Sequence, residues 1–200
     1  MRLLLATRNR NKVTEMQHAL AGTGWQVVML SDLKDMPDVV EDGGTLEENA
    51  RKKARSAAKR AKMWVLAEDA GLEVDALGGE PGVHSARYCG DGASDADRMR
   101  KVLDRIIAVP DDRRTARFRC VMCLIDPTGK ETCFEGRCEG RISHHARGSA
   151  GFGYDPIFVP DGYSRTFGEL GMSIKGKISH RARAMQQVIS FLQSQTPVVR

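Results

Sequence analysis

The sequence has no hydrophobic run long enough to cross a membrane. Apolar stretches such as Leu3–Ala6 and Met63–Ala67 contain only a few residues, whereas a membrane helix needs about 20. Met1 and Arg2, followed by so short an apolar run, do not form a signal peptide. Linkers, internal repeats and low-complexity segments are also missing. We therefore expect a soluble, cytoplasmic chain with no membrane partner, folded as one domain over residues 1–200.

Cysteines are few, and their number is odd: the chain has five in 200 residues. Without an export signal we expect these thiols to be reduced. Cys120 and Cys123, with Cys133 and Cys138, faintly resemble a four-thiolate zinc site. However, Arg117–Ile125 alternates as a strand, which would turn Cys120 and Cys123 to opposite faces. The sequence therefore argues against zinc.

Acidic residues are absent from Arg51–Lys62, which carries seven lysines and arginines in a chain of net charge +5. Such a block suits a polyanion, either nucleic acid or the phosphates of a nucleotide. The commoner explanation is a solvated helix face. A basic nucleic-acid-binding module is thus the alternative from another functional class. It leaves Glu68 and Asp69 unexplained, because carboxylates repel phosphate unless a metal intervenes.

Those two acids lie in the most informative stretch of the chain. Met63–Ala67 is typical of a short buried strand, and Glu68, Asp69 and Gly71 follow it. We expect the chain to turn sharply at Gly71, which would leave both acids at the exit of the strand. Carboxylates in such a place bind a divalent cation, act as a general base or cap the next turn.

A second polar segment follows the opening strand Leu3–Ala6. Thr7–Lys12 forms a polar loop, and a helix is expected to begin at Val13. Free N–H groups and the helix dipole make such a junction a ready anion site. The segment is not a P-loop, because the glycines and the Lys-Ser/Thr pair are missing. An ordinary helix start with an asparagine cap is the alternative.

A capping box, Thr45 with Glu48, opens the next predicted helix. Asn49 and Lys53 share one face of this helix and could line a cleft. The acidic loop before it contains Glu41, which either is solvated or helps to hold a metal.

The remaining pattern alternates strands and helices. A helix should start at Ser94 and stop before Pro110, a solvated turn should cover Asp111–Arg114, and a last helix should begin at Ser179. Strands are expected at Trp25–Leu30, Arg117–Ile125, Glu131–Cys138 and Ile157–Val159.

Two polar segments near the end of the chain suggest ligand contacts. Glycines flank Phe152, so its ring either stacks on a flat ligand or is buried in a turn. His180 and Arg181 place positive charge in the first turn of a helix, where the dipole disfavours it. Donors aimed at an anion or a carbonyl would explain them.

Taken together, these residues resemble the inosine triphosphate pyrophosphatase family. The resemblance spans nearly the whole chain, and its segments occur in the family's order. They are Ala6-Thr7-x-Asn9-x-x-Lys12; Glu48-Asn49-Ala50 with Lys53-Ala54; Asp69-x-Gly71-Leu72-x-Val74-Asp75-Ala76-Leu77; Pro81-Gly82-Val83-x-Ser85-Ala86-Arg87-Tyr88; Gly151-Phe152-Gly153-Tyr154-Asp155-Pro156-Ile157-Phe158; and Ile178-Ser179-His180-Arg181. Each motif alone is moderate evidence, but the set in order is specific.

The resemblance implies an elongated α/β fold, with a long, curled mixed sheet flanked by helices and a central substrate cleft between two lobes. It also implies a homodimer that hydrolyses ITP, dITP, XTP and dXTP to the monophosphate and pyrophosphate with Mg²⁺. Such an enzyme removes deaminated purines from the nucleotide pool and has no stable nucleic-acid partner. A hydrolase of other modified nucleoside triphosphates is the nearer alternative.

The same resemblance assigns roles to individual positions. Asp69 matches the catalytic base and a metal ligand, with Glu68 and Glu41 as further metal candidates. The substrate-binding positions are Thr7, Arg8, Asn9, Arg10, Asn11 and Lys12 in the phosphate loop; Lys53 on the phosphates; Ala70; and Phe152, Gly153, Tyr154, Asp155, Lys175, His180 and Arg181 around the base and sugar.

Four positions depart from the family pattern. Arg8 replaces a usual glycine, Glu68 a frequent Asp, and Ala70 a frequent Ser, so residue 70 can contribute only backbone groups. Val40 precedes Glu41 where two adjacent glutamates are common, which makes a metal ligand there doubtful.

Chemistry favours Asp69 as general base and metal contact. A triphosphate carries about four negative charges, which must be neutralised while a water is aligned. Adjacent strand residues face opposite ways, so Glu68 and Asp69 cannot both point at one atom unless the strand bends. Donors from Arg181, or from backbone N–H groups near His180, would select the 6-carbonyl of hypoxanthine and xanthine over the amino group of adenine.

Overall fold

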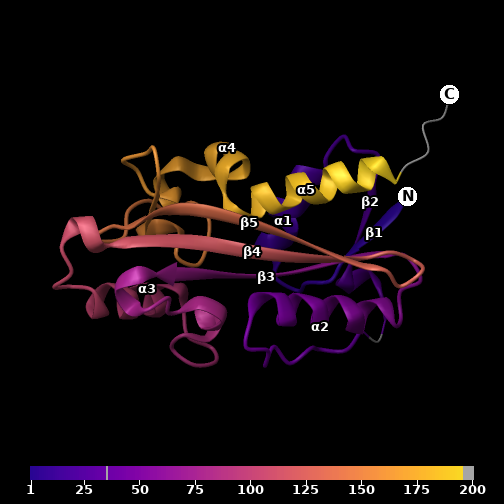
Figure 1. Cartoon of the computed structure of the whole chain (residues 1–200), viewed down its shortest axis with the longest axis horizontal. Coiled ribbons are helices and arrows are strands. Elements are labelled where there is room, and N and C mark those ends of the chain that lie inside the picture. Colours follow the sequence, from indigo (N-terminus) through magenta and orange to yellow (C-terminus); the bar gives the residue numbers. More distant parts are fainter. Residues whose placement is uncertain (35, 196–200) are drawn as a thin grey trace. The chain divides into compact units, whose positions relative to one another are not determined.

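The computed structural model describes residues 1–34 and 36–195 (Figure 1). In this described part the α-helices are α1 (Arg10–Leu20), α2 (Leu46–Ala58), α3 (Asp95–Arg105), α4 (Phe167–Ile178) and α5 (His180–Ser194). The strands are β1 (Arg2–Leu5), β2 (Gln26–Met29), β3 (Trp64–Val74), β4 (Thr115–Ile125), β5 (Glu131–Ile142) and β6 (Phe158–Pro160). Helices and strands alternate for much of the chain, as the sequence predicts.

The strands join in one mixed sheet in the order β2-β1-β3-β4-β5-β6. β1 pairs in parallel with β2 and with β3, while β5 and β6 are antiparallel. The predicted α/β class with a mixed sheet and flanking helices is therefore confirmed.

The chain divides into two compact units. Unit 1 contains Met1–Asp69, Cys120–Gly136 and the chain from Arg181 on, and unit 2 contains Ala70–Arg119 and Arg137–His180. The long strands β3, β4 and β5 contribute residues to both units.

The core of unit 1 forms around β1. Leu3, Leu4 and Leu5 are all fully buried, as expected for a parallel strand covered on both faces. α1 buries Val13, Met16 and Leu20. α2 buries a stripe of alanines, Ala50, Ala54 and Ala57, which lets it pack closely.

The core of unit 2 is richer in aromatic residues. The rings of Phe118 and Phe158 lie 4.7 Å apart, and Phe158 stacks on Phe167. Val102 of α3 and Ile106, which follows this helix, also belong to this core.

Arg114 departs from the predicted solvated turn, whose other residues, Asp111–Arg113, are exposed as expected. Its side chain is buried and donates hydrogen bonds to the carbonyl oxygens of Ile106, Ile142 and Ser143 at 2.8–2.9 Å. An arginine can be buried when its N–H donors meet carbonyl oxygens in this way.

The predicted sharp turn at Gly71 is also wrong. β3 runs from Trp64 to Val74 without interruption, so Glu68 and Asp69 lie in the middle of the strand rather than at its exit. Gly71 is required for a different reason. A Cβ atom there would lie 2.2 Å from the carbonyl oxygen of Gly82, so only glycine permits the close approach of the two backbones.

Two helix predictions also need correction. α1 starts at Arg10 rather than Val13, because the Asn9 side chain caps it by accepting from the Lys12 N–H. The sequence pattern gave no prediction of α4, because the non-helical Gly171 interrupts the expected helical period.

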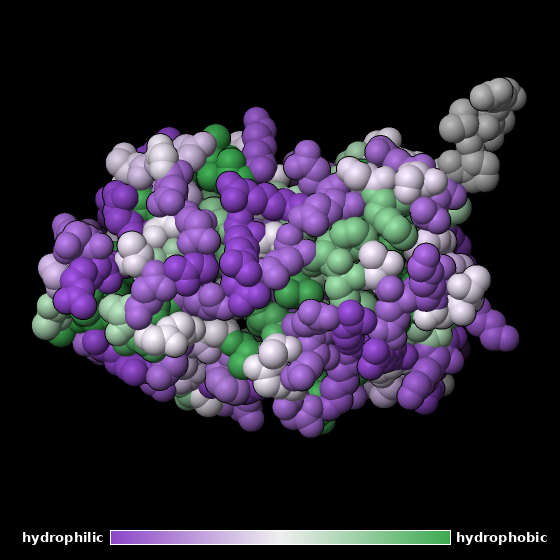
Figure 2. Space-filling model, viewed as in Figure 1, coloured by the Kyte–Doolittle hydropathy of each residue, from purple (hydrophilic) through white to green (hydrophobic). Residues whose placement is uncertain are grey.

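The visible face of the molecule is mainly hydrophilic, with smaller hydrophobic areas between the polar side chains (Figure 2). Among the described residues, none of the helices combines the length and apolar character needed to cross a bilayer.

Candidate functional site

Glu68 and Asp69 are neighbours on β3 with different surroundings in unit 1. Both are buried, with 1% and 6% of their surfaces exposed. Side chains alternate along a strand, so the two carboxylates turn toward different partners. This alternation divides the charged residues of unit 1 into two groups.

The first group surrounds Glu68 with donors. Arg181 binds both carboxylate oxygens, with Nε 2.9 Å from Oε2 and Nη2 3.1 Å from Oε1. Lys12 Nζ lies 3.0 Å from Oε1, and Cys120 Sγ lies 3.0 Å from Oε2. Burial alone would raise the pKa of Glu68, but the charges of Arg181 and Lys12 outweigh it and hold this pKa well below its usual range. Glu68 is therefore a fixed anion.

Arg181 is buried between two carboxylates. Besides Glu68, it pairs with Glu15 of α1, whose Oε2 lies 2.6 Å from Nη1. These contacts explain why positive charge is tolerated in the first turn of α5. They also engage three of the guanidinium nitrogens with protein carboxylates, which gives Arg181 a structural role in addition to any role with a base.

The second group surrounds Asp69. Lys53 Nζ lies 3.1 Å from Oδ1, and Asn49 Nδ2 donates to Oδ2 at 3.1 Å. The same ammonium lies 2.8 Å from Glu41 Oε2. Burial raises the pKa of Asp69 despite the nearby Lys53, whereas for Glu41 the Lys53 charge outweighs burial and lowers the pKa. Burial thus favours a bound proton on Asp69, which suits a general base.

The two groups differ in how well they suit a metal. Glu41 and Asp69 already face one cationic position, that of Lys53 Nζ, while both Glu68 oxygens accept from cationic donors. In the described part of the chain, His, Cys, Asp and Glu side chains form no group of three or more that could hold a metal alone. Mg²⁺ prefers one or two carboxylates together with phosphate oxygens and waters, so Asp69 with Glu41 fits it better than Glu68.

The polar loop before α1 supplies the predicted anion-binding groups. Asn9 caps the helix, and its own N–H donates to Thr7 Oγ1 at 3.2 Å. The first turn of α1 contains no acid, and Arg10 and Asn11 in this turn are exposed. The N-terminus of α1 thus keeps the positive end of its dipole uncompensated by a side chain of its own first turn.

Arg8 contacts the acidic loop instead. Its Nε lies 2.7 Å from Asp38 Oδ1, and its Nη2 donates to the Met36 carbonyl at 2.7 Å. The side chain is 55% exposed. The residue that replaces a usual glycine therefore links the polar loop before α1 to the segment that carries Glu41.

In unit 2, Asp155 organises the glycine-rich loop around Phe152. Asp155 is buried and accepts from Lys175 Nζ at 2.6 Å and from the Phe152 N–H at 2.8 Å. A Cβ at Gly151 would lie 2.0 Å from Asp155 Oδ2, so this glycine permits the fold of the loop. Lys175 Nζ lies 4.5 Å from the centre of the Phe152 ring, a distance typical of a cation–π contact. The Phe152 ring is half-buried, and the Lys175 ammonium lies over one of its faces.

Other predicted contacts in unit 2 are also tied into the protein. Tyr154 is buried and donates its hydroxyl to the Ser85 carbonyl at 2.9 Å. The Gly153 N–H donates to Asp95 Oδ2 at 2.7 Å. His180 is buried and stacks on Phe118, with ring centres 4.7 Å apart. Ala70 is half-buried on β3.

The basic run on α2 is largely paired with acids of unit 1. Arg51 and Arg55 both bind Glu131, at 2.7 Å and 2.6 Å, and Lys52 pairs with Asp42. Lys53 pairs with Asp69 and Glu41 as described. This pairing weakens the case for a nucleic-acid-binding surface on this helix.

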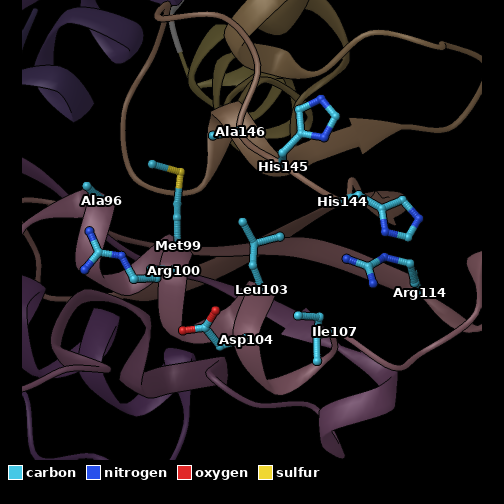
Figure 3. Close-up of a pocket in the computed structure, with 10 residues that line it drawn as sticks. All are labelled: Ala96, Met99, Arg100, Leu103, Asp104, Ile107, Arg114, His144, His145 and Ala146. Carbon is cyan, nitrogen blue, oxygen red and sulfur yellow. The ribbon is translucent and has the colours of Figure 1, made fainter.

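A cavity of about 370 Å³ lies in unit 2 beside α3, apart from the predicted site residues. Figure 3 shows Met99 and Leu103 of α3, and Ile107 just after this helix, near His144, His145 and Ala146 of the segment after β5. His144 also pairs with Asp111 at 2.5 Å. None of the residues predicted to carry the chemistry lines this cavity, so it does not define the candidate site.

Two residues of unit 1 were missing from the predicted site. Glu15 gave no signal in the sequence beyond its place on a helix. Asn49 was noticed because it shares a face with Lys53 and lies in a family motif, but it was given no role, yet it is fully buried and bonds Asp69 directly. Its amide oxygen also accepts from the Gly43 N–H at 2.8 Å, which fixes the amide toward Asp69.

Two bacterial proteins with similar sequences carry the same name. A dITP/XTP pyrophosphatase of Symbiobacterium thermophilum is 50% identical over 192 residues, covering 96% of this chain and 94% of its own. A dITP/XTP pyrophosphatase of Desulforamulus reducens is 45% identical and 96% of each chain is covered.

Solved structures agree with the sequence comparison. A HAM1 protein from Coxiella burnetii superimposes with a TM-score of 0.88 at 39% identity, covering 97% of this chain and 99% of its own. The Staphylococcus aureus Ham1 protein gives a TM-score of 0.87 at 36% identity, covering 98% and 100%. The profile of the Ham1 family matches residues 3–191. The chain therefore belongs to the Ham1 family.

Proposed function

We propose that this protein hydrolyses nonstandard purine nucleoside triphosphates, namely ITP, dITP, XTP and dXTP, to the nucleoside monophosphate and pyrophosphate. The observation that carries the proposal is the arrangement around Asp69: a buried carboxylate of raised pKa beside Lys53 and Glu41. Relatives that share about half of the sequence are named for this activity.

Within unit 1 the proposed roles follow from charge. Thr7 to Lys12 and the N-terminus of α1 would hold phosphate oxygens, and Lys53 would add a further phosphate contact. Asp69 and Glu41 would hold Mg²⁺, which when bound neutralises phosphate charge. Glu15, Glu41, Glu68 and Asp69 face Lys12, Lys53 and Arg181, so the acids exceed the bases by one charge and a cation is favoured there.

Asp69 is the proposed general base. Its carboxylate would take the proton of the attacking water, and the Asn49 amide and Lys53 ammonium fix its orientation. Glu68 would not share the metal. We propose instead that it holds Lys12 near the phosphate loop, with Arg181 and Glu15 completing its neutralisation.

Within unit 2, Phe152 is the proposed contact for the purine face. Asp155 and Lys175 would act through it by holding its loop. Backbone N–H groups near His180 remain the proposed donors to the 6-carbonyl, because the Arg181 donors toward Glu68 and Glu15 are already engaged. A site that must donate to position 6 discriminates strongly against adenine.

A panel of nucleotides at equal concentration tests the function. Pyrophosphate release should be fast with ITP, dITP and XTP and slow with ATP, GTP and the pyrimidine triphosphates, and it should require Mg²⁺. Hydrolysis in ¹⁸O water identifies the phosphorus attacked. Equal rates with ATP and ITP, or a preference for a modified pyrimidine, would contradict the proposal.

We also propose a homodimer in the cytoplasm, where the nucleotide pool is found. Light scattering of the full chain over a concentration series measures the oligomeric state directly. A monomer at all concentrations would remove the dimer from the proposal without affecting the assigned chemistry.

A further inference from the structure

The register of the β4–β5 hairpin brings two cysteines face to face. At the turn, the Asp126 N–H donates to the Lys130 carbonyl at 3.1 Å, and at the far end the Ile142 N–H donates to the Arg114 carbonyl at 2.9 Å. Both bonds define the same register. Counting from either end places Cys123 of β4 directly opposite Cys133 of β5.

The two cysteines occupy a position suited to a cross-strand bond. In an antiparallel pair, hydrogen-bonded and non-hydrogen-bonded positions alternate. Since Asp126 and Lys130 form a hydrogen-bonded pair, Cys123 and Cys133 fall at a non-hydrogen-bonded position. Facing Cα atoms there are about 4.5 Å apart, which lies within the disulfide range of about 4.4–6.8 Å. Both residues are free thiols in the structure.

The two thiols differ in access and in charge environment. Cys133 is partly exposed, whereas Cys123 is buried. The Cys123 thiol as donor, together with the positive charge of Arg51, lowers the pKa of Cys133. The same pairing, with burial, raises the pKa of Cys123. Arg51 is held near this place by Glu47 and Glu131, at 2.8 Å and 2.7 Å. A partly exposed thiol of lowered pKa that faces a buried thiol is the arrangement of an attacking and a resolving cysteine.

We propose that Cys123 and Cys133 form an oxidation site, which a peroxide converts to an intramolecular disulfide. The Cys133 thiolate attacks one peroxide oxygen, the O–O bond breaks, and Cys133 becomes a sulfenic acid while the second oxygen leaves as water after taking a proton. The Cys123 sulfur then attacks the Cys133 sulfur, the S–O bond breaks, and the hydroxide takes the Cys123 proton as water. Two thiols lose two electrons in all, and the peroxide gains them.

The other cysteines lack this combination. Cys120 is buried against Glu68, and burial raises the pKa of its thiol well above the usual range. Cys138 is buried. Cys89 is partly exposed like Cys133, but it lies outside both strands of the hairpin. Cys89 is therefore a matched control, because it is partly exposed like Cys133 but has no cysteine opposite it in the hairpin.

The test treats the full-length protein with a small excess of hydrogen peroxide. Thiols are then counted in denaturant, and non-reducing peptide mapping locates any crosslink. We expect two of the five thiols to disappear, a single Cys123–Cys133 linkage, and full recovery with dithiothreitol. Cys89→Ser should still lose two thiols. Cys123→Ser should instead stop at a dimedone-trappable sulfenic acid on Cys133.

Three results would overturn the proposal. One is retention of all five thiols in the wild type under these conditions. Another is oxidation of Cys133 to sulfinic acid in the wild type with Cys123 still a thiol, which would mean that Cys123 does not resolve it. The third is a crosslink in the wild type that involves Cys89, either within one chain or between two chains.

Discussion

The substitution Glu68→Gln tests how strongly the buried charges of unit 1 hold the fold together. Glu68 accepts from Arg181, Lys12 and Cys120, and its side chain is fully buried. Glutamine keeps the shape but replaces one oxygen with an NH₂ group. Whichever oxygen the NH₂ group replaces, it faces hydrogen-bond donors of the protein. Lys12 and Arg181 also lose the negative charge that lay between them.

The expected loss of stability is large. Removing one partner from a buried ion pair costs about 3–5 kcal/mol, because the remaining charge stays buried without compensation. For a chain of this length, such a loss lowers Tm by about 6–20 °C. Glu15 still neutralises part of the Arg181 charge, so we expect the lower half of the range. Since total stabilities are about 5–15 kcal/mol, the variant should remain folded at 25 °C.

Urea unfolding of the wild type and the variant measures the effect. Asp38→Asn is the matched control, because it also removes a carboxylate from an arginine but in an exposed pair, with side chains 55% and 86% exposed. Exposed pairs contribute about 0–1 kcal/mol. If Glu68→Gln and Asp38→Asn shifted the urea midpoint equally at equal m-values, the reasoning about burial would be refuted.

The same comparison has a pH dependence of definite sign. The folded pKa of Glu68 lies well below its ordinary value of 4.5, so its contribution is complete above pH 4.5. As the pH falls below this value, the unfolded chain takes up the proton first, and the contribution is lost progressively toward the folded pKa. The advantage of the wild type over Glu68→Gln should therefore shrink on acidification below pH 4.5. An advantage that grew in acid would contradict the sign.

The remaining predictions concern Asp69 and Gly71. Asp69→Asn should reduce pyrophosphate release from ITP by about 10²–10⁴-fold. It should not lower Tm, because the raised pKa of Asp69 means that folding disfavours its ionised form above pH 3.8. Near-normal activity of this variant would exclude Asp69 as the base. Gly71→Ala should lose at least about 1–3 kcal/mol, since its Cβ would meet the Gly82 carbonyl at 2.2 Å. Gly176→Ala on α4 should raise the free energy of unfolding by up to about 1 kcal/mol, because its Cβ would have nothing within 4 Å. Equal urea midpoints for the two alanine variants would refute the packing argument.

Local patterns explain why much of the fold could be predicted. The capping boxes at Thr45 and Ser94 begin α2 and α3 where expected, because a cap is satisfied by residues only three positions away. The alternation in Arg117–Ile125 likewise marks β4. Arg114 could not be predicted in this way. Its burial depends on carbonyl oxygens of Ile106 and Ile142, and the latter is 28 positions away.

The candidate site shows the same limit. Lys12, Lys53 and Asp69 could be singled out, since each lies in a segment with an unusual local pattern or a family motif. Glu15 could not, because its importance comes from Arg181, which is 166 positions away. Contacts over such separations are set by how strands and helices meet, and a single sequence contains no local trace of them.

The preference for Asp69 over Glu68 rests on one reason in the sequence and on another in the structure. The sequence favoured Asp69 partly because a glycine turn was expected beside it, and β3 contains no turn there. The physical distinction is charge balance. Glu68 is surrounded by cationic donors that lower its pKa, while burial raises the pKa of Asp69 even beside Lys53. A carboxylate that the protein already neutralises has a low affinity for a metal ion or a proton. The one that remains under-compensated is the one available for chemistry, and strand alternation is what separates two adjacent acids into these two states.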